Sequence, residues 1–139
     1  MSNHILRILI LDCDPEFLIE VEHLLESDGF DTTVTWDVWE AIALLASREF
    51  DVILVGEHPP EVRSKEILES LRAMHKPTPC IVLQGEQTYP FQGEYLCSLG
   101  AYGVIPKWEY RTVVKHVRQA HHHSDDLKNG GRGRASTCA

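Results

Sequence analysis

The chain has little basic charge and no long apolar run, and both absences restrict its function. It carries 13 Lys and Arg against 21 Asp and Glu, a formal net charge of −8 at pH 7. Nucleic-acid binding depends on neutralising phosphates, so this acidic balance argues against direct contact with DNA or RNA. No apolar stretch approaches the roughly 20 residues needed to cross a bilayer. Residues 1–5 have neither the basic region nor the cleavage site of a secretory signal, so we expect a cytoplasmic protein with no membrane contact.

The sequence also lacks the patterns of a metal centre, a nucleotide site or a hydrolytic site. Its four cysteines form no C-x-x-C pair, and Cys80 and Cys97 lie in apolar contexts, so we expect both to be reduced. His116 and the histidines 121–123 offer no closed ligand set. The glycines near the C-terminus follow no strand and open no helix, as a nucleotide fingerprint requires. We therefore expect no cofactor and no enzymatic activity in the ordinary sense.

Apolar runs alternate with amphipathic segments along 139 residues, a length that suits one domain. The alternation favours an α/β fold in which helices cover both faces of a parallel sheet. The predicted strands are 5–11, 32–36, 52–55, 80–83 and 102–105, and the predicted helices are 15–28, 38–50, 65–74, 90–99 and 109–120. The composition then becomes rich in Gly, Ser and Arg. We therefore expect a folded domain over residues 1–120 and a disordered tail or linker over 121–139.

Capping residues mark the helix ends. The carboxylate of Asp14 precedes Pro15, whose ring is already set to helical φ, so these residues are expected to start the first helix. Gly29 is placed to end it. Ser64 is the expected cap of the third helix.

Residues that could take part in binding or catalysis follow three of the predicted strands. Asp12 and Asp14 follow the first strand, Gly56 stands in a turn that ends at Pro60 after the third, and Lys107 follows the fifth. In open α/β sheets, ligands bind outside the carboxyl ends of the strands. We therefore expect these residues to meet at one edge of the sheet, with Asp14 turned away as a helix cap.

This pattern of acids, a turn and a lysine resembles the receiver domain of response regulators, the CheY-like family, over about residues 5–120. The local motifs Gly100-Ala101 and Lys107 add to the resemblance. It implies a flavodoxin-like, doubly wound sheet of five parallel strands in the order 2-1-3-4-5. It also implies a role in two-component or phosphorelay signal transduction. In that family, an aspartate in the turn accepts a phosphoryl group, and two acids after the first strand help to hold Mg²⁺.

The residues that carry this chemistry are mostly replaced. The phosphoacceptor position aligns with Gly56, which has no side chain to phosphorylate. The pair of acids aligns with Asp12 and Cys13, and Mg²⁺ does not use a soft sulfur ligand, so Asp12 alone is a weak magnesium candidate. The hydroxyl after the fourth strand aligns with Gln84. The aromatic residue that switches on phosphorylation aligns with Val104, which cannot make that movement.

Asp12 and Lys107 remain, and we interpret them as a structural pair, because a partly buried charge without a partner is costly. The sequence thus predicts a pseudo-receiver that acts by protein–protein interaction with a histidine kinase or a downstream effector. The resemblance implies a docking or homodimer surface on the fourth helix, fifth strand and fifth helix. Arg111, Lys115 and Arg118 give the last helix a basic face, which either meets an acidic surface or is merely solvated.

Two alternatives stay open. Phosphorylation could use Glu57, although a shift of one residue turns its side chain to the other face of the strand. Alternatively, the space that Gly56 leaves beside Lys107 and Gln84 could hold a small anionic ligand. His58 is interpreted as an ordinary loop histidine.

Overall fold

The protein folds as a five-stranded parallel sheet with helices on both faces. The computed structural model describes residues 4–86 and 93–128. The strand order is β2-β1-β3-β4-β5, which confirms the predicted topology. The strands are β1 (Arg7–Leu11), β2 (Asp31–Thr35), β3 (Val52–Glu57), β4 (Cys80–Gln84) and β5 (Gly103–Pro106). The helices are α1 (Pro15–Ser27), α2 (Val38–Ser47), α3 (Ser64–Ala73), α4 (Gly93–Ser98), the 3₁₀ helix η1 (Lys107–Thr112) and α5 (Val113–Lys128).

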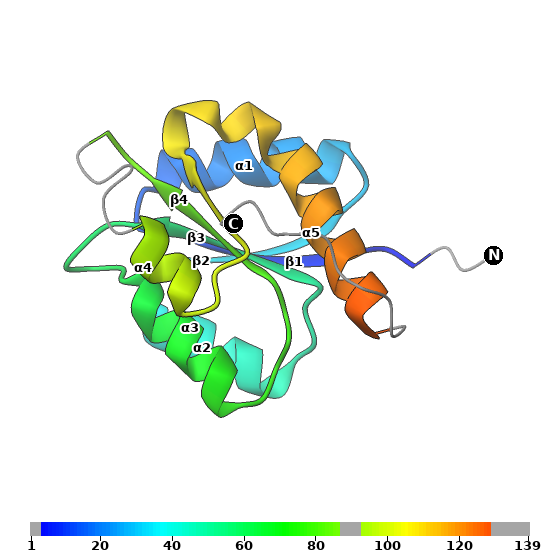
Figure 1. Ribbon diagram of the computed structural model, residues 1–139. Helices are drawn as coiled ribbons and strands as arrows, with labels where there is room; N and C mark the ends of the chain where they lie inside the picture. The colour runs from blue at the N-terminus through cyan, green and yellow to red at the C-terminus, as the bar shows by residue number, and fades with distance from the viewer. Residues whose placement is uncertain (1–3, 87–92, 129–139) are drawn as a thin grey trace.

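Two apolar clusters hold the layers together. Helices α1 and α5 cover one face of the sheet, and α2, α3 and α4 cover the other (Figure 1). Because side chains alternate along a strand, Ile8 and Ile10 pack in the cluster under α1 and α5, whereas Leu9 and Leu11 pack in the cluster under α2, α3 and α4. All four side chains are buried. Burial on both faces explains why the strands appear in the sequence as nearly unbroken apolar runs.

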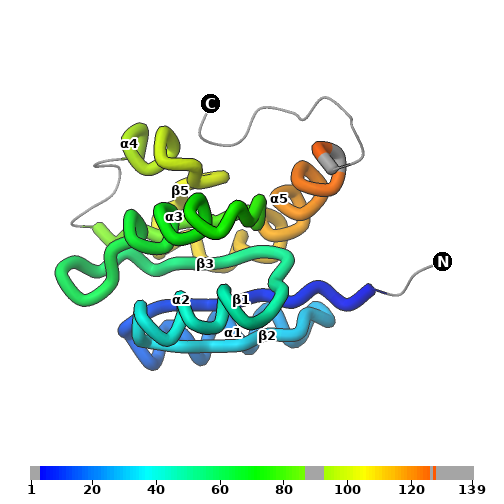
Figure 2. The backbone as a smooth tube through the Cα atoms, turned by 90° about the horizontal axis from the view of Figure 1, so that it is seen from below, coloured from blue at the N-terminus to red at the C-terminus, as the bar shows by residue number. Residues whose placement is uncertain are grey.

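The edge strands differ from the interior ones. Figure 2 shows β2 at one edge of the sheet and β5 near the other, with β1 and β3 between them. Three of the five residues of β2 are only partly buried, whereas every residue of β4 is buried. The polar residues Thr32 and Thr33 are therefore tolerated in β2, where fewer neighbours pack against them.

Asp14 starts α1 as predicted. Its carboxylate accepts hydrogen bonds from the backbone N–H groups of Glu16, at 3.1 Å, and Phe17, at 3.4 Å. Asp37 does the same for α2, accepting from Trp39 N–H at 3.2 Å. Gly29 follows α1 with φ of +90°, a left-handed conformation that glycine adopts without steric cost.

The last helix is longer than predicted. We expected it to end at residue 120, but α5 continues to Lys128. Ala120 and Ser124 are both buried and lie four residues apart, so the inward stripe of the helix continues through the polar histidine run. The polar composition hid this stripe because histidine and serine can pack inward as well as face water. The rest of the predicted tail, residues 129–139, lies outside the described residues.

Two further predictions concern the cysteines and the fourth helix. Cys80 is buried with a free thiol, as expected. Cys97 is disulfide-bonded, so the prediction of a reduced thiol there is wrong. Its side chain is only partly buried, unlike that of Cys80, and the apolar sequence context did not reveal this difference.

The fourth helix is described over Gly93–Ser98, and the predicted start at residue 90 lies outside the described residues.

Candidate functional site

The carboxyl ends of four strands bring the predicted site residues to one edge of the sheet. β1 and β3 are paired up to Leu11 and Val55, so Asp12 and Gly56 follow side by side. Across the next two strand pairs, Gln84 is in register with Glu57 and with Pro106. Lys107 follows Pro106 directly. This is the edge at which ligands bind in sheets of this topology.

Asp12 and Lys107 form a buried ion pair. Lys107 Nζ lies 2.6 Å from Asp12 Oδ2, and the two side chains are 18% and 1% exposed respectively. The other carboxylate oxygen, Oδ1, accepts a hydrogen bond from Asp14 N–H at 2.9 Å. Lys107 Nζ also lies 4.7 Å from the centre of the Phe17 ring, a cation–π contact that sequence reasoning missed. Oδ1 is thus hydrogen-bonded, whereas the buried Oδ2 is held by its charge contact with Lys107 and has no hydrogen-bond partner among the described residues.

Gly56 is adjacent to this pair and lies within β3, which continues to Glu57, so the prediction that it stands in the turn after the strand is wrong. A Cβ atom placed on Gly56 would lie 1.8 Å from Asp12 Oδ2 and 2.5 Å from Asp12 Cγ, far inside van der Waals contact. The Asp12 carboxylate therefore occupies the volume into which a side chain at position 56 would project. This corrects one expectation: the space that Gly56 leaves beside Lys107 is filled by Asp12 and is not open for an anionic ligand. A carboxylate there would also repel an anion.

The Glu57 side chain is hydrogen-bonded to the first turn of α3. Its carboxylate accepts a hydrogen bond from Ser64 N–H at 3.2 Å, where the helix N-terminus favours negative charge. The connecting turn is closed by two backbone hydrogen bonds between His58 and Val62, at 2.9 and 2.8 Å. The expected cap at Ser64 is wrong. Arg63 holds the N-cap position without a side-chain hydrogen bond, and Ser64 is buried in the first turn.

The other aligned positions are Cys13, Gln84 and Val104. Burial raises the pKa of the Cys13 thiol, and the Asp12 charge raises it further against an opposing effect of Lys107, so the thiol stays protonated at neutral pH. Gln84 is buried at the end of β4. Val104 is partly buried and packs against the cluster under α2, α3 and α4. Among residues 4–86 and 93–128, no group of three or more His, Cys, Asp or Glu side chains could hold a metal ion.

The three predicted basic residues have different surroundings. Arg118 pairs with the Asp28 carboxylate, and its guanidinium lies 4.7 Å from the centre of the Phe30 ring. Arg111 belongs to η1 and lies 5.8 Å from the centre of the Tyr110 ring. Lys115 is exposed on α5. Arg118 thus ties α5 to the end of α1, which leaves Arg111 and Lys115 as the more available cations.

Comparison with known proteins agrees with this geometry. Residues 8–118 match the family model of the response regulator receiver domain, so the chain belongs to this family and is a receiver domain of two-component signalling. It is 30% identical over 133 residues to the transcriptional regulatory protein CpxR of Escherichia coli K12, with 91% of this chain and 55% of CpxR aligned. It is 29% identical over 80 residues to the cell cycle response regulator CtrA of Brucella ovis, which covers 58% of this chain and 34% of CtrA. The chain thus spans about half the length of CpxR, or less for CtrA.

Solved structures show the same fold. The receiver domain of the Francisella response regulator 1452 superimposes with a TM-score of 0.75 at 23% identity, covering 84% of this chain and 96% of that one. A CheY-like receiver domain protein from Methanospirillum hungatei gives 0.80 at 20% identity, covering 89% and 99%. Receiver domains are signalling modules, and response regulators interact with histidine kinases and effectors. Within the described residues, no helix is both long and apolar enough to span a bilayer.

Proposed function

We propose that this chain is a pseudo-receiver: a cytoplasmic protein-interaction module that works without phosphorylation of an aspartate at the end of β3. One observation carries the proposal. Asp12 Oδ2 lies 1.8 Å from the position of a Cβ on Gly56, and the same oxygen is paired with Lys107 at 2.6 Å. The lysine that would contact an incoming phosphoryl group is therefore already bound to a carboxylate.

The proposal follows from what phosphoryl transfer requires. The reaction depends on positioning a nucleophile and on stabilising negative charge with cations. Gly56 offers no nucleophile, and the Asp12 carboxylate is 1% exposed, with Oδ2 paired with the Lys107 ammonium and Oδ1 hydrogen-bonded to Asp14 N–H. The Glu57 carboxylate is committed to Ser64 N–H at the start of α3. We infer that the Asp12–Lys107 pair fixes the strand ends in one arrangement, and that signalling depends on which partner binds.

Phosphorylation can be tested directly on the intact chain. After incubation with Mg²⁺ and acetyl phosphate, mass spectrometry should show no added phosphoryl group of about 80 Da. A receiver that retains the acceptor aspartate, treated in parallel, controls for the activity of the phosphodonor. A Mg²⁺-dependent adduct that disappears in Glu57→Gln would instead establish Glu57 as the acceptor. An adduct that persists in that variant would point to another residue and would equally overturn the proposal.

We place the partner surface on α4, β5, η1 and α5, where Arg111 of η1 and Lys115 of α5 are exposed on an acidic protein. Opposite charges across an interface mainly increase the rate of association and its specificity. The double variant Arg111→Glu/Lys115→Glu should therefore weaken self-association, measured by light scattering, or capture of a cognate kinase or effector. Arg63→Glu/Lys65→Glu at the start of α3 is the matched control, since it also reverses two exposed cations, on another face of the domain. Equal behaviour of both variants would argue against this surface.

A further inference from the structure

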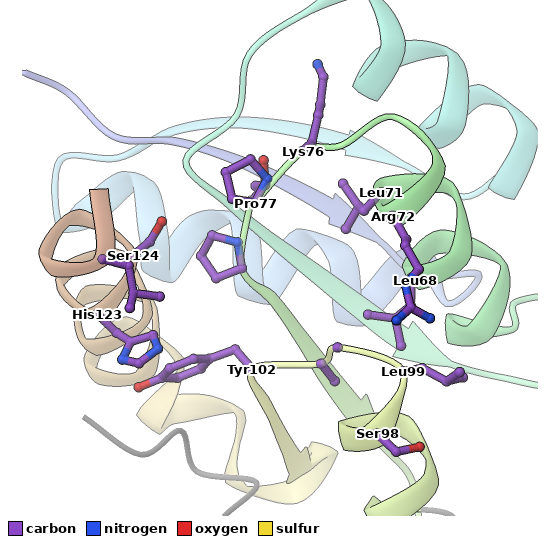
Figure 3. Close-up of a pocket in the computed structure, with 15 residues that line it drawn as sticks. Leu68, Leu71, Arg72, Lys76, Pro77, Ser98, Leu99, Tyr102, His123 and Ser124 are labelled. Atoms are coloured by element: carbon purple, nitrogen blue, oxygen red, sulfur yellow. The ribbon is translucent and has the colours of Figure 1, made fainter. Parts of the chain in front are cut away.

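A cavity lies at the amino ends of the strands, on the opposite side of the sheet from the carboxyl ends that carry Asp12 and Lys107. This cavity of about 580 Å³ opens where β4 and β5 begin, bounded by the last turns of α3, α4 and α5 (Figure 3). This volume falls in the range of about 300–1,000 Å³ that is common for small-molecule sites. The continuation of α5 past residue 120 is essential to it, because His123, Ser124 and Leu127 form part of its wall.

The walls of the cavity are mainly apolar. Leu68 and Leu71 of α3, Leu99 after α4, and Leu127 of α5 line it, together with Tyr102. Leu127 is 54% exposed, which leaves apolar surface available to a ligand. Tyr102 is partly buried, and this burial raises the pKa of its hydroxyl above the ordinary value. The lining therefore suits an apolar body of modest size.

Two polar groups of the cavity have no partner in the part of the chain that the structure describes. The Nδ1 atom of His123 is buried and has no hydrogen-bond partner in the described part of the chain. Its ring lies 5.5 Å from the Tyr102 ring, and Figure 3 shows the two side chains facing each other. The Arg72 guanidinium is exposed at the rim and makes no ion pair or hydrogen bond within residues 4–86 and 93–128. A buried polar atom without a partner is costly, so a ligand that reaches His123 gains binding energy.

Of the two cations that line the cavity, Arg72 rather than Lys76 is available to a ligand. Although Lys76 contributes to the lining, its side chain extends away from the cavity (Figure 3). Its ammonium donates to the carbonyl groups of Leu45 and Arg48 and lies 3.5 Å from the Glu49 carboxylate. Among the described residues, Arg72 is therefore the cation at this rim that has no carboxylate paired with it.

We propose that this cavity binds a small anionic amphiphile, a molecule with an aliphatic or aromatic body and a single carboxylate. The body lies against Leu68, Leu71 and Leu99, and the carboxylate pairs with Arg72. A hydroxyl or N–H group on the body hydrogen-bonds to His123 Nδ1. This cavity shares no residue with the Asp12–Lys107 pair, so a ligand could act on the protein there without phosphorylation.

Octanoate is a suitable probe, with octylammonium and octanol as matched probes of opposite and zero charge. Isothermal titration calorimetry on the full chain should show one saturable octanoate site, and octylammonium should bind at least about tenfold more weakly. Arg72→Gln should weaken octanoate by about tenfold while leaving octanol unchanged. Leu99→Trp should fill the cavity and abolish binding of both. Backbone amide NMR shifts of residues 99–102 and 123–127 should move on binding.

The melting temperature of each variant controls for unfolding, and Arg72→Gln changes only an exposed side chain. Three outcomes would overturn the proposal: no saturable octanoate binding up to millimolar concentrations, equal affinity for octylammonium, or binding that is insensitive to both variants. The last result would place the bound molecule elsewhere on the surface.

Discussion

Replacing Gly56 by alanine is the most direct test of the strand-end geometry. Gly56 does not have the left-handed backbone conformation of Gly29 and Gly100, so alanine fits its backbone. Without a neighbour, such a change would stabilise the fold by about 0.4–1 kcal/mol through the unfolded state. The sign of the measured effect therefore depends on Asp12, whose Oδ2 lies 1.8 Å from the new methyl position.

The size of the effect follows from how the clash is relieved. If the backbone shifts, the cost is that of overpacking, about 1–3 kcal/mol. If Asp12 turns away, it leaves Lys107, and breaking a buried ion pair costs about 3–5 kcal/mol. We expect Gly56→Ala to lower the free energy of unfolding by about 2–4 kcal/mol, a fall of roughly 5–15 °C in the melting temperature.

Urea denaturation followed by circular dichroism measures this change. Gly93→Ala is the matched control, because a Cβ there meets nothing within 4 Å and its φ is not left-handed. Asp12→Ala removes the contacts at 1.8 and 2.5 Å and leaves only the Cβ of residue 12, at 3.2 Å, so adding Gly56→Ala in that background should cost much less than in wild type. The reasoning is refuted if Gly56→Ala is as stable as Gly93→Ala, or if its cost persists in that background.

Three smaller predictions follow from other groups. Burial raises the pKa of Cys80 from 9.0 to about 12. The stability contributed by the buried neutral thiol is therefore present below about pH 9 and is lost as the pH rises toward 12. In urea titrations across this range, wild type should lose stability relative to Cys80→Ala. Glu57→Gln should destabilise the protein by about 0.5–1 kcal/mol, because a neutral amide interacts more weakly with the start of α3; an unchanged urea midpoint would contradict this. A double-mutant cycle on the exposed Arg118–Asp28 pair should give a coupling of about 0.2–1 kcal/mol that weakens in salt, and a salt-independent coupling would contradict it.

The fold was predictable from the sequence because its signals are local and repeated. Apolar runs such as residues 8–11 and 52–55 are required of strands buried on both faces, and Asp14 and Gly29 mark the ends of α1 through short-range geometry. The end of α5 was not predictable in the same way. Its inward positions beyond residue 120 include Ser124, whose burial depends on neighbours that are distant in sequence.

The site was predicted in part. The spacing of Asp12, Gly56 and Lys107 indicated that they meet, since parallel strands end at one edge. The spacing did not show that Asp12 fills the place beside Gly56, because this depends on a side-chain rotamer. The contact of Phe17 was missed for a similar reason: its ring packs against the cluster under α1 and α5, and whether it also meets the Lys107 ammonium depends on side-chain rotamers.

By itself, the sequence determined the order of strands and helices, the family resemblance and the absence of a carboxylate at position 56, because each depends on residue type and local spacing. Only the tertiary structure decided what replaces that carboxylate. It brought Asp12, Gly56 and Lys107 within contact across three strands, and it directed Glu57 to α3. It also extended α5 to form the second cavity. These features depend on distances between residues that are far apart in the chain, which no local pattern specifies.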